Sequence, residues 1–127
     1  MTEIAQVTST DGLARLSELL HDQWFDLDDV RFLNADALLK VVFGETGSGK
    51  LADRGQRALL TVRHVESYRV QDSQQIGRYD FNVILYDSSI KRLTVLTGIP
   101  CVFWMIVRRL ELILEVDDSE IGSGATD

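Results

Sequence analysis

Cysteine and proline are scarce in this chain of 127 residues, which contains one of each, Cys101 and Pro100. A single cysteine excludes an internal disulfide and is typical of proteins from reducing compartments. Cys101 lies within an apolar run, so we expect it to be a buried small hydrophobe. The longest uninterrupted apolar run, from Cys101 to Val107, is far shorter than the roughly 20 residues that a membrane-spanning helix needs.

Positive charge is also limited. The chain has 13 Lys and Arg against 20 Asp and Glu, a formal net charge of −7. This balance argues against a nucleic-acid binder, because phosphate contacts need clustered basic side chains. The first residues, MTEIAQVTSTDG, have neither the basic nor the apolar segment of a signal peptide. We therefore expect a cytoplasmic protein with neither membrane nor nucleic acid among its partners.

Length and composition predict a single globular domain over residues 1–127. The chain is long enough to bury a core, and its 45% hydrophobic and 26% charged residues are typical of globular proteins. Two segments have little to bury. We expect the glycine-rich segment at 44–57 to be a mobile loop and the acidic tail from residue 117 to be disordered.

The densest apolar block, residues 79–116, is central to the fold prediction. Apolar alternation between turn residues predicts strands at 81–86, buried on both faces, and at 93–97. Residues 101–116 fit either a strand or a helix. Their β-branched and aromatic beginning, CVFWMIV, favours a strand, with a break at Arg108 and Arg109.

The first half of the chain predicts one helix and further strands. Apolar residues recur at helical spacing from residue 11 to 24, namely at Leu13, Leu16, Leu20 and Trp24. Thr10 or Asp11 can cap this helix, and residues 1–9 are expected to be a frayed lead-in.

Two further strand regions follow the predicted helix. We expect a hairpin at 29–43 that turns at Asn34-Ala35-Asp36, and a strand at 58–70 that bends near Glu66 and Ser67. The whole pattern predicts an α+β fold, with one N-terminal helix packed on a curved, mostly antiparallel sheet of about six strands. Its curvature can approach an open barrel or roll.

The stretch GETGSGK at residues 44–50 resembles the P-loop of nucleotide-binding proteins. Glycines let backbone N–H groups surround phosphates, and the lysine offsets their charge. The resemblance implies a phosphate-ligand site at Gly44, Gly47, Gly49 and Lys50. The stretch departs from the pattern at Leu51, where the P-loop has the Ser or Thr that holds Mg²⁺. An exposed flexible loop is the alternative interpretation.

The stretch FDLDD at residues 25–29 resembles the first motif of haloacid-dehalogenase-type phosphatases. The resemblance implies Asp26 as nucleophile and Asp28 as acid/base, with Mg²⁺ between them. It also implies a hydroxyl from Thr97 and a metal-binding pair at Asp117-Asp118. However, no lysine lies between Thr97 and that pair, and the residues before Asp26 are helix-like where the family has a buried strand. A solvated acidic turn is the alternative.

Neither histidine has a second ligand at metal-binding spacing. His21 and Asp22 are adjacent, so on a helix their side chains diverge by about 100°, and Phe25 stands one turn further on. His64 falls in a strand pattern, where a hydrogen-bonded structural histidine is the common outcome. We find no Ser/His/Asp set and no base beside Cys101. The sequence therefore predicts no metal and no cofactor, and it favours a non-catalytic protein.

The leading functional hypothesis is a small non-catalytic binding or accessory module. Its partner would be another protein or a second copy of the chain, contacted through a sheet edge or the charged loop. An acidic segment at 22–36 is followed by a basic one at 50–69, and such segregation can steer association.

A second hypothesis is a small apolar ligand held inside the curved sheet. Four aromatic residues fall in the predicted walls, namely Phe81, Tyr86, Phe103 and Trp104. Ligand pockets are commonly lined by such side chains, although aromatic stripes at strand spacing usually belong to the core.

Overall fold

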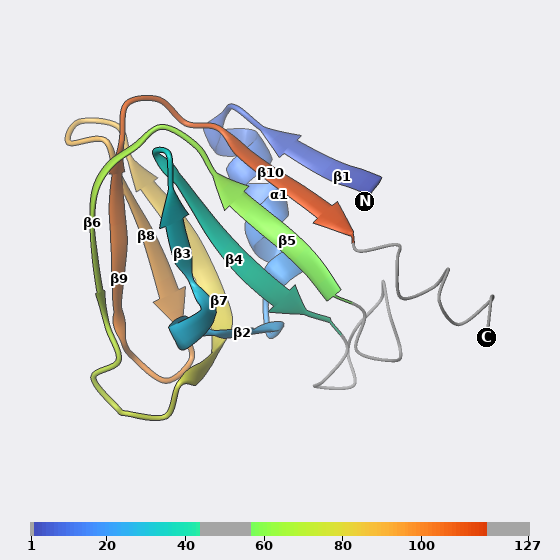
Figure 1. The fold of residues 1–127 in the computed structure, drawn as a ribbon. Helices are drawn as coiled ribbons and strands as arrows, with labels where there is room; N and C mark the ends of the chain where they lie inside the picture. Colours follow the sequence, from blue (N-terminus) through green and yellow to red (C-terminus); the bar gives the residue numbers. More distant parts are fainter. Residues whose placement is uncertain (1, 44–56, 117–127) are drawn as a thin grey trace.

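The computed structural model describes residues 2–43 and 57–116. One α-helix packs against a large antiparallel sheet (Figure 1), which confirms the predicted α+β class. The predicted loop at 44–57 lies outside the described residues except for Arg57, and so does the predicted tail from 117. The elements are β1 (Thr2–Val7), α1 (Thr10–Leu20), β2 (Trp24–Asp26), the 3₁₀ helix η1 (Leu27–Asp29), β3 (Arg31–Leu33), β4 (Asp36–Val42), β5 (Arg57–Val62), β6 (Val65–Gln71), β7 (Arg78–Asp87), β8 (Arg92–Thr97), β9 (Val102–Val107) and β10 (Leu112–Val116).

The sheet has ten strands in the order β1-β10-β5-β4-β2-β7-β8-β9-β6, with β3 beside β4. All pairings between these strands are antiparallel. The prediction of about six strands is wrong in number. Within the segment 1–9, predicted as a frayed lead-in, Thr2–Val7 form β1 on β10, and β2 forms where the helix was expected to end. The stretch 58–70 supplies two strands, β5 and β6, rather than one.

The sheet curves but is not a closed barrel, because its path of paired strands ends at β1 and β6. The short strand β3, which pairs with β4 inside this path, approaches the end strand β6. The ring of Phe32 stacks on that of Tyr68 with 3.5 Å between centroids, and the Ala35 carbonyl accepts the Val65 N–H at 2.8 Å. These contacts connect β6 to the β3–β4 hairpin.

Helix α1 begins one residue earlier than predicted and ends four residues earlier. Its cap is Ser9, whose Oγ accepts the Gly12 N–H at 3.1 Å, rather than Thr10 or Asp11. The helix ends at Leu20, and Asp22 adopts a left-handed conformation with φ of 67°. Trp24, predicted as the last residue of the helical stripe, instead pairs with Asp80 and Val42 in β2.

The hairpin predicted at 29–43 is confirmed as β3 and β4. Asn34 and Ala35 connect the strands with φ of 52° and 67°. Two successive positive φ angles match the twist of the flanking strands in a two-residue hairpin. Asparagine adopts this conformation readily and alanine rarely. The residue type therefore indicates a left-handed conformation at Asn34 but not at Ala35.

Residues 101–116 are strands, as favoured, and the predicted break at Arg108 and Arg109 separates β9 from β10. The strand predicted at 58–70 is instead interrupted at Arg63 and His64, and a register shift between Val65 and Ser67 follows. The prediction that 81–86 is buried on both faces is wrong, since the Leu85 side chain is 51% exposed.

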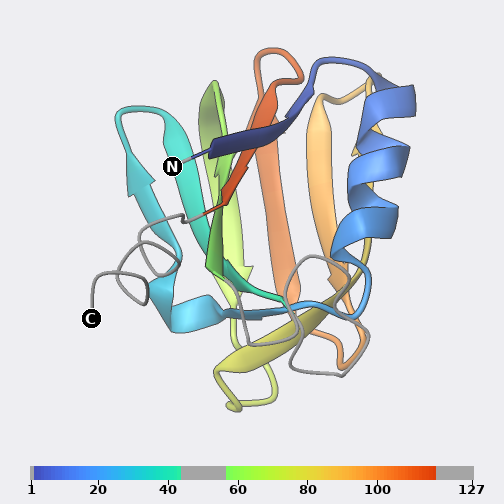
Figure 2. The same ribbon diagram turned by 90° about the vertical axis from the view of Figure 1, so that its right-hand side faces the viewer.

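The core lies between the curved sheet and α1. Phe25 is at its centre, with its ring centroid 4.6 Å from that of Phe81 and 6.0 Å from that of Phe103. Figure 2 shows α1 on one side of the molecule and β3 on the other. Helix α1 contacts both β7 and β1, and its Leu13, Leu16 and Leu20 join the buried cluster.

We expect Phe103→Ala to lower the free energy of unfolding by about 3–5 kcal/mol, because it leaves a cavity beside Phe25. Leu33→Ala, at a side chain 56% exposed, should change it by less than about 0.5 kcal/mol. Urea unfolding followed by circular dichroism measures both. Equal effects of the two substitutions would contradict this description of the core.

Candidate functional site

The residues of the P-loop resemblance, Gly44, Gly47, Gly49 and Lys50, lie outside the described residues. The same is true of Asp117 and Asp118 from the phosphatase resemblance. The structure therefore neither assembles nor separates these two predicted sites.

The FDLDD stretch is placed at the end of β2 and in η1. Arg78 Nε donates to Asp26 Oδ1 at 2.9 Å, and the Asp26 side chain is 40% exposed. Strand β2 is antiparallel to both β4 and β7. This setting differs from the buried parallel strand that the phosphatase resemblance implies. Asp26 instead forms a half-exposed ion pair between two neighbouring strands.

The aromatic residues predicted for a ligand cavity point in different directions. Phe81 and Phe103 are buried and contact Phe25 in the core. Trp104 lies on the opposite side of β9 from Phe103, turned away from the core. Side chains thus occupy the space in which the apolar-ligand hypothesis placed a ligand.

Cys101 is partly buried, less than expected. Burial raises the pKa of its thiol, and the hydroxyl of Thr97 lies 3.6 Å from the sulfur. A raised pKa keeps the thiol protonated and unreactive. Within the part of the chain that the structure describes, no group of three or more His, Cys, Asp or Glu side chains could hold a metal ion. No helix in the same part is long and apolar enough to cross a membrane.

His64 forms a charged cluster with residues of the β9–β10 connection. Its Nε2 lies 2.7 Å from Glu111 Oε1 and 3.0 Å from Arg109 Nε. One nitrogen cannot donate to a carboxylate and accept from a guanidinium at once. The shorter contact, to the carboxylate, identifies Nε2 as the proton-bearing nitrogen. The Arg63 N–H also donates to the Glu111 carbonyl at 2.9 Å, so these contacts connect the β5–β6 turn to the β9–β10 connection.

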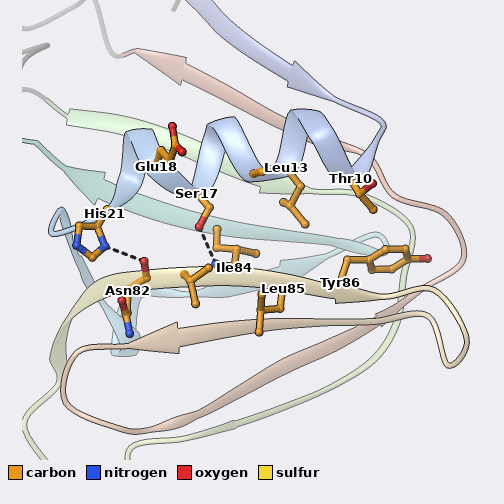
Figure 3. Close-up of a pocket in the computed structure, with 11 residues that line it drawn as sticks. Thr10, Leu13, Ser17, Glu18, His21, Asn82, Ile84, Leu85 and Tyr86 are labelled. Atoms are coloured by element: carbon orange, nitrogen blue, oxygen red, sulfur yellow. Dashed lines mark hydrogen bonds between the residues drawn. The ribbon is translucent and has the colours of Figure 1, made fainter.

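A groove of about 640 Å³ lies between α1 and β7 (Figure 3). Strand β2 pairs with β7 only over Arg78–Asp80, so the same edge of β7 needs other partners further along. Helix α1 supplies them. Ser17 Oγ accepts the Ile84 N–H at 2.9 Å, and His21 Nδ1 donates to the Asn82 carbonyl at 2.8 Å.

The groove does not assemble a catalytic set. Ser17 and His21 stand one turn apart on α1, the spacing of a nucleophile and its base. Both are instead hydrogen-bonded to the backbone of β7 (Figure 3). Ser17 is also buried, with 6% exposure. The pair fixes α1 against β7 and leaves no activated hydroxyl for a substrate.

A further surface with apolar side chains is the side of β7, β8, β9 and β6 that faces away from the core, which we call the outer face. Buried and more exposed positions alternate along β8 and β9, and the partners on adjacent strands are opposite one another. The outer face consists of Val83, Leu85 and Asp87 from β7; Arg92, Thr94 and Leu96 from β8; Val102, Trp104 and Ile106 from β9; and Ser67, Arg69 and Gln71 from β6.

Two of these apolar side chains are exposed to solvent. Leu85 is 51% and Leu96 is 39% exposed, and Ile90 and Ile99 are exposed in the turns that flank β8. The Arg92 guanidinium lies 4.4 Å from the centroid of the Trp104 ring, a favourable cation–π geometry. Arg92 Nε is buried and has no hydrogen-bond partner among the described residues, so the ring itself holds this arginine.

Sequence reasoning missed the outer face. Its signal was present, since β9 is apolar at all six positions from Val102 to Val107. Such a run indicates cover on both sides of a strand. The sequence does not identify which side of β9 faces the core. It also does not show whether the other side is covered by the same chain or by a partner.

Comparisons with known proteins give no further assignment. A scan against protein-family models, a search of curated proteins and a search of solved structures each find no match to this chain.

Ser17→Ala should lower the free energy of unfolding by about 1–3 kcal/mol, because the buried Ile84 N–H would lose its acceptor. The exposed Ser67→Ala serves as the control, and chemical denaturation is the measurement. If the two variants are equally stable, α1 is not held on β7 by this hydrogen bond.

The hydrogen bond from His64, assisted by Arg63 and Arg109, lowers the pKa of Glu111. A lowered pKa in the folded state stabilises the protein above the unfolded pKa of about 4.3, and this contribution is lost as the pH falls through the folded pKa. Unfolding free energies of the wild type and Glu111→Gln should therefore differ at pH 7 and converge in acid. A difference that does not change with pH would exclude this linkage.

Proposed function

We propose that this protein is a non-catalytic protein-interaction module that binds its partner with the outer face. The exposure of Leu85 on β7 and of Leu96 on the neighbouring strand β8 is the observation that carries the proposal. The proposal refines the hypothesis drawn from the sequence by locating the contact on a sheet face rather than on an edge or in the charged loop.

The energetics of apolar surface support this proposal. Removing apolar area from water is worth about 25 cal/mol per Å², so a partner that covers these leucines and the neighbouring Val83 and Ile106 gains stability. Single exposed apolar residues are common, but a contiguous group of them marks interaction surfaces. Four of the eight large apolar side chains exposed in the described residues, Leu85, Ile90, Leu96 and Ile99, belong to β7, β8 and their turns.

The composition of the outer face is also that of a protein interface. Aromatic residues and arginine are enriched in such interfaces, and Trp104 with Arg92 occupies the centre. Polar residues lie at the borders, with Asp87 on β7 and Arg69 and Gln71 on β6. An apolar centre with a polar rim is the usual anatomy of a protein–protein contact.

A matched pair of substitutions tests the proposal. Leu96 on β8 and Ile4 on β1 are both 39% exposed, so Leu96→Lys and Ile4→Lys place the same charge at equal exposure on different surfaces. Wild type and both variants are immobilised on a resin and incubated with a lysate of the source cells. We expect wild type and Ile4→Lys to retain the same proteins, and Leu96→Lys to lose them. Mass spectrometry identifies them, and copies of the chain itself count among them.

Thermal melts check that both variants remain folded. Capture of the same proteins by wild type, Leu96→Lys and Ile4→Lys would show that the outer face is not the binding surface.

A further inference from the structure

The partner that best fits the outer face is a second copy of this chain. We propose that two copies pack their outer faces together about a twofold axis that runs along the strands. This inference rests on the proposed function and names the partner for the same surface. It follows from the placement of charge at the two borders of the face.

Asp87 and Arg69, which have opposite charges, lie at the two borders of the outer face. On β7, Asp87 is exposed, and Asp80 is half-buried with its Oδ1 accepting the Gly98 N–H at 3.1 Å. On β6, the other border, Arg69 is exposed on the outer face, and the exposed Glu66 is the residue at the register shift between Val65 and Ser67. Hydrogen bonds from Ser89, and then the charge of Arg92, hold the pKa of Asp87 below its usual value. Asp87 and Arg69 are therefore both charged at neutral pH.

The strand register arranges the face in rows. One row contains Leu85, Thr94, Trp104 and Arg69, and the next contains Asp87, Arg92, Ile106 and Ser67. Rows on one face of a sheet are two residues apart, or about 7 Å. An arginine side chain spans that distance, so Arg69 can reach a group opposite the neighbouring row.

A twofold axis along the strands makes these borders meet. It places β7 of one copy over β6 of the other, so Asp87 lies opposite the Ser67 row, within reach of Arg69. Symmetry produces this contact twice. The apolar side chains of β8 and β9 face their counterparts between the two contacts, at the roughly 10 Å separation of packed sheets.

The other in-plane twofold axis, perpendicular to the strands, is unfavourable. It places β7 over β7 and β6 over β6, which brings the Asp80 and Asp87 border onto itself and Arg69 near its own copy. Like charges brought together at an interface oppose association. The charge distribution thus selects one of the two simple face-to-face arrangements.

The size of the face indicates a weak dimer. Four strands about 4.8 Å apart and three rows about 7 Å apart cover roughly 400 Å² per copy. A standard interface covers about 800 Å² per partner, and smaller ones belong to transient complexes. Self-association should therefore appear as the concentration rises from the micromolar to the millimolar range.

A charge exchange in the full-length chain tests the arrangement. We expect Arg69→Asp and Asp87→Lys each to weaken self-association at least about tenfold, because each brings like charges together. The double variant should recover it, since the pair is restored with its signs reversed. Sedimentation velocity over a concentration series measures all four proteins.

Asp87 also accepts hydrogen bonds from Ser89 in the β7–β8 turn, so Asp87→Lys could disturb folding. Asp87→Asn retains an acceptor for Ser89 and removes the charge, and it should weaken association while thermal melts show that the variant is still folded. A double variant that is no better than the singles, or a wild type that stays monomeric at millimolar concentration, overturns the dimer. If the dimer is overturned but Leu96→Lys still loses the proteins captured by wild type, the proposed interaction module stands. If Leu96→Lys captures the same proteins as wild type, both the dimer and the interaction module fail.

Discussion

Strand β7 exchanges one partner for another along its length, and the rest of the structure depends on this exchange. Arg78–Asp80 pair with β2, whereas the residues from Phe81 onward pair with β8 on the opposite edge. Where β2 ends, β7 has an open edge whose backbone groups require partners. Helix α1 supplies them through Ser17 and His21. The helix is therefore located by the hydrogen-bonding needs of β7 as well as by its apolar stripe.

The β-bulge in β7 determines which side chains form the outer face. The register with β8 shifts between Phe81 and Val83, and one extra residue moves every later side chain to the other face. Without the shift, Val83 and Leu85 would follow Phe81 into the core. With it, Ile84 is buried and Leu85 is exposed. Both sets of positions are apolar, so either arrangement fills the core, and only the bulge makes Leu85 accessible.

The same ambiguity limits what the sequence can predict. Local patterns were sufficient for the α+β class, for the hairpin at 29–43 and for the break at Arg108 and Arg109, because each has its own turn residues or period. They failed for β1, in which three of the six residues are polar and which becomes a strand by pairing with β10 more than a hundred residues away. They also failed for Trp24, whose helical spacing from Leu20 continues past the turn at Asp22. The outer face was not foreseen, because apolar residues at successive positions were interpreted as buried on both sides.

A strand that is apolar on both sides needs cover on both sides, and this requirement links the fold to the function that we propose. The core covers the inner side of β8 and β9 through Leu93, Val95, Phe103 and Met105. On the outer side the chain supplies only neighbouring strands and the guanidinium of Arg92 over Trp104. A second copy would carry the same excess of apolar surface and the same opposed borders, so one sequence would satisfy both sides of the contact. Self-association would then cover the outer side of these strands, which the isolated chain leaves partly exposed.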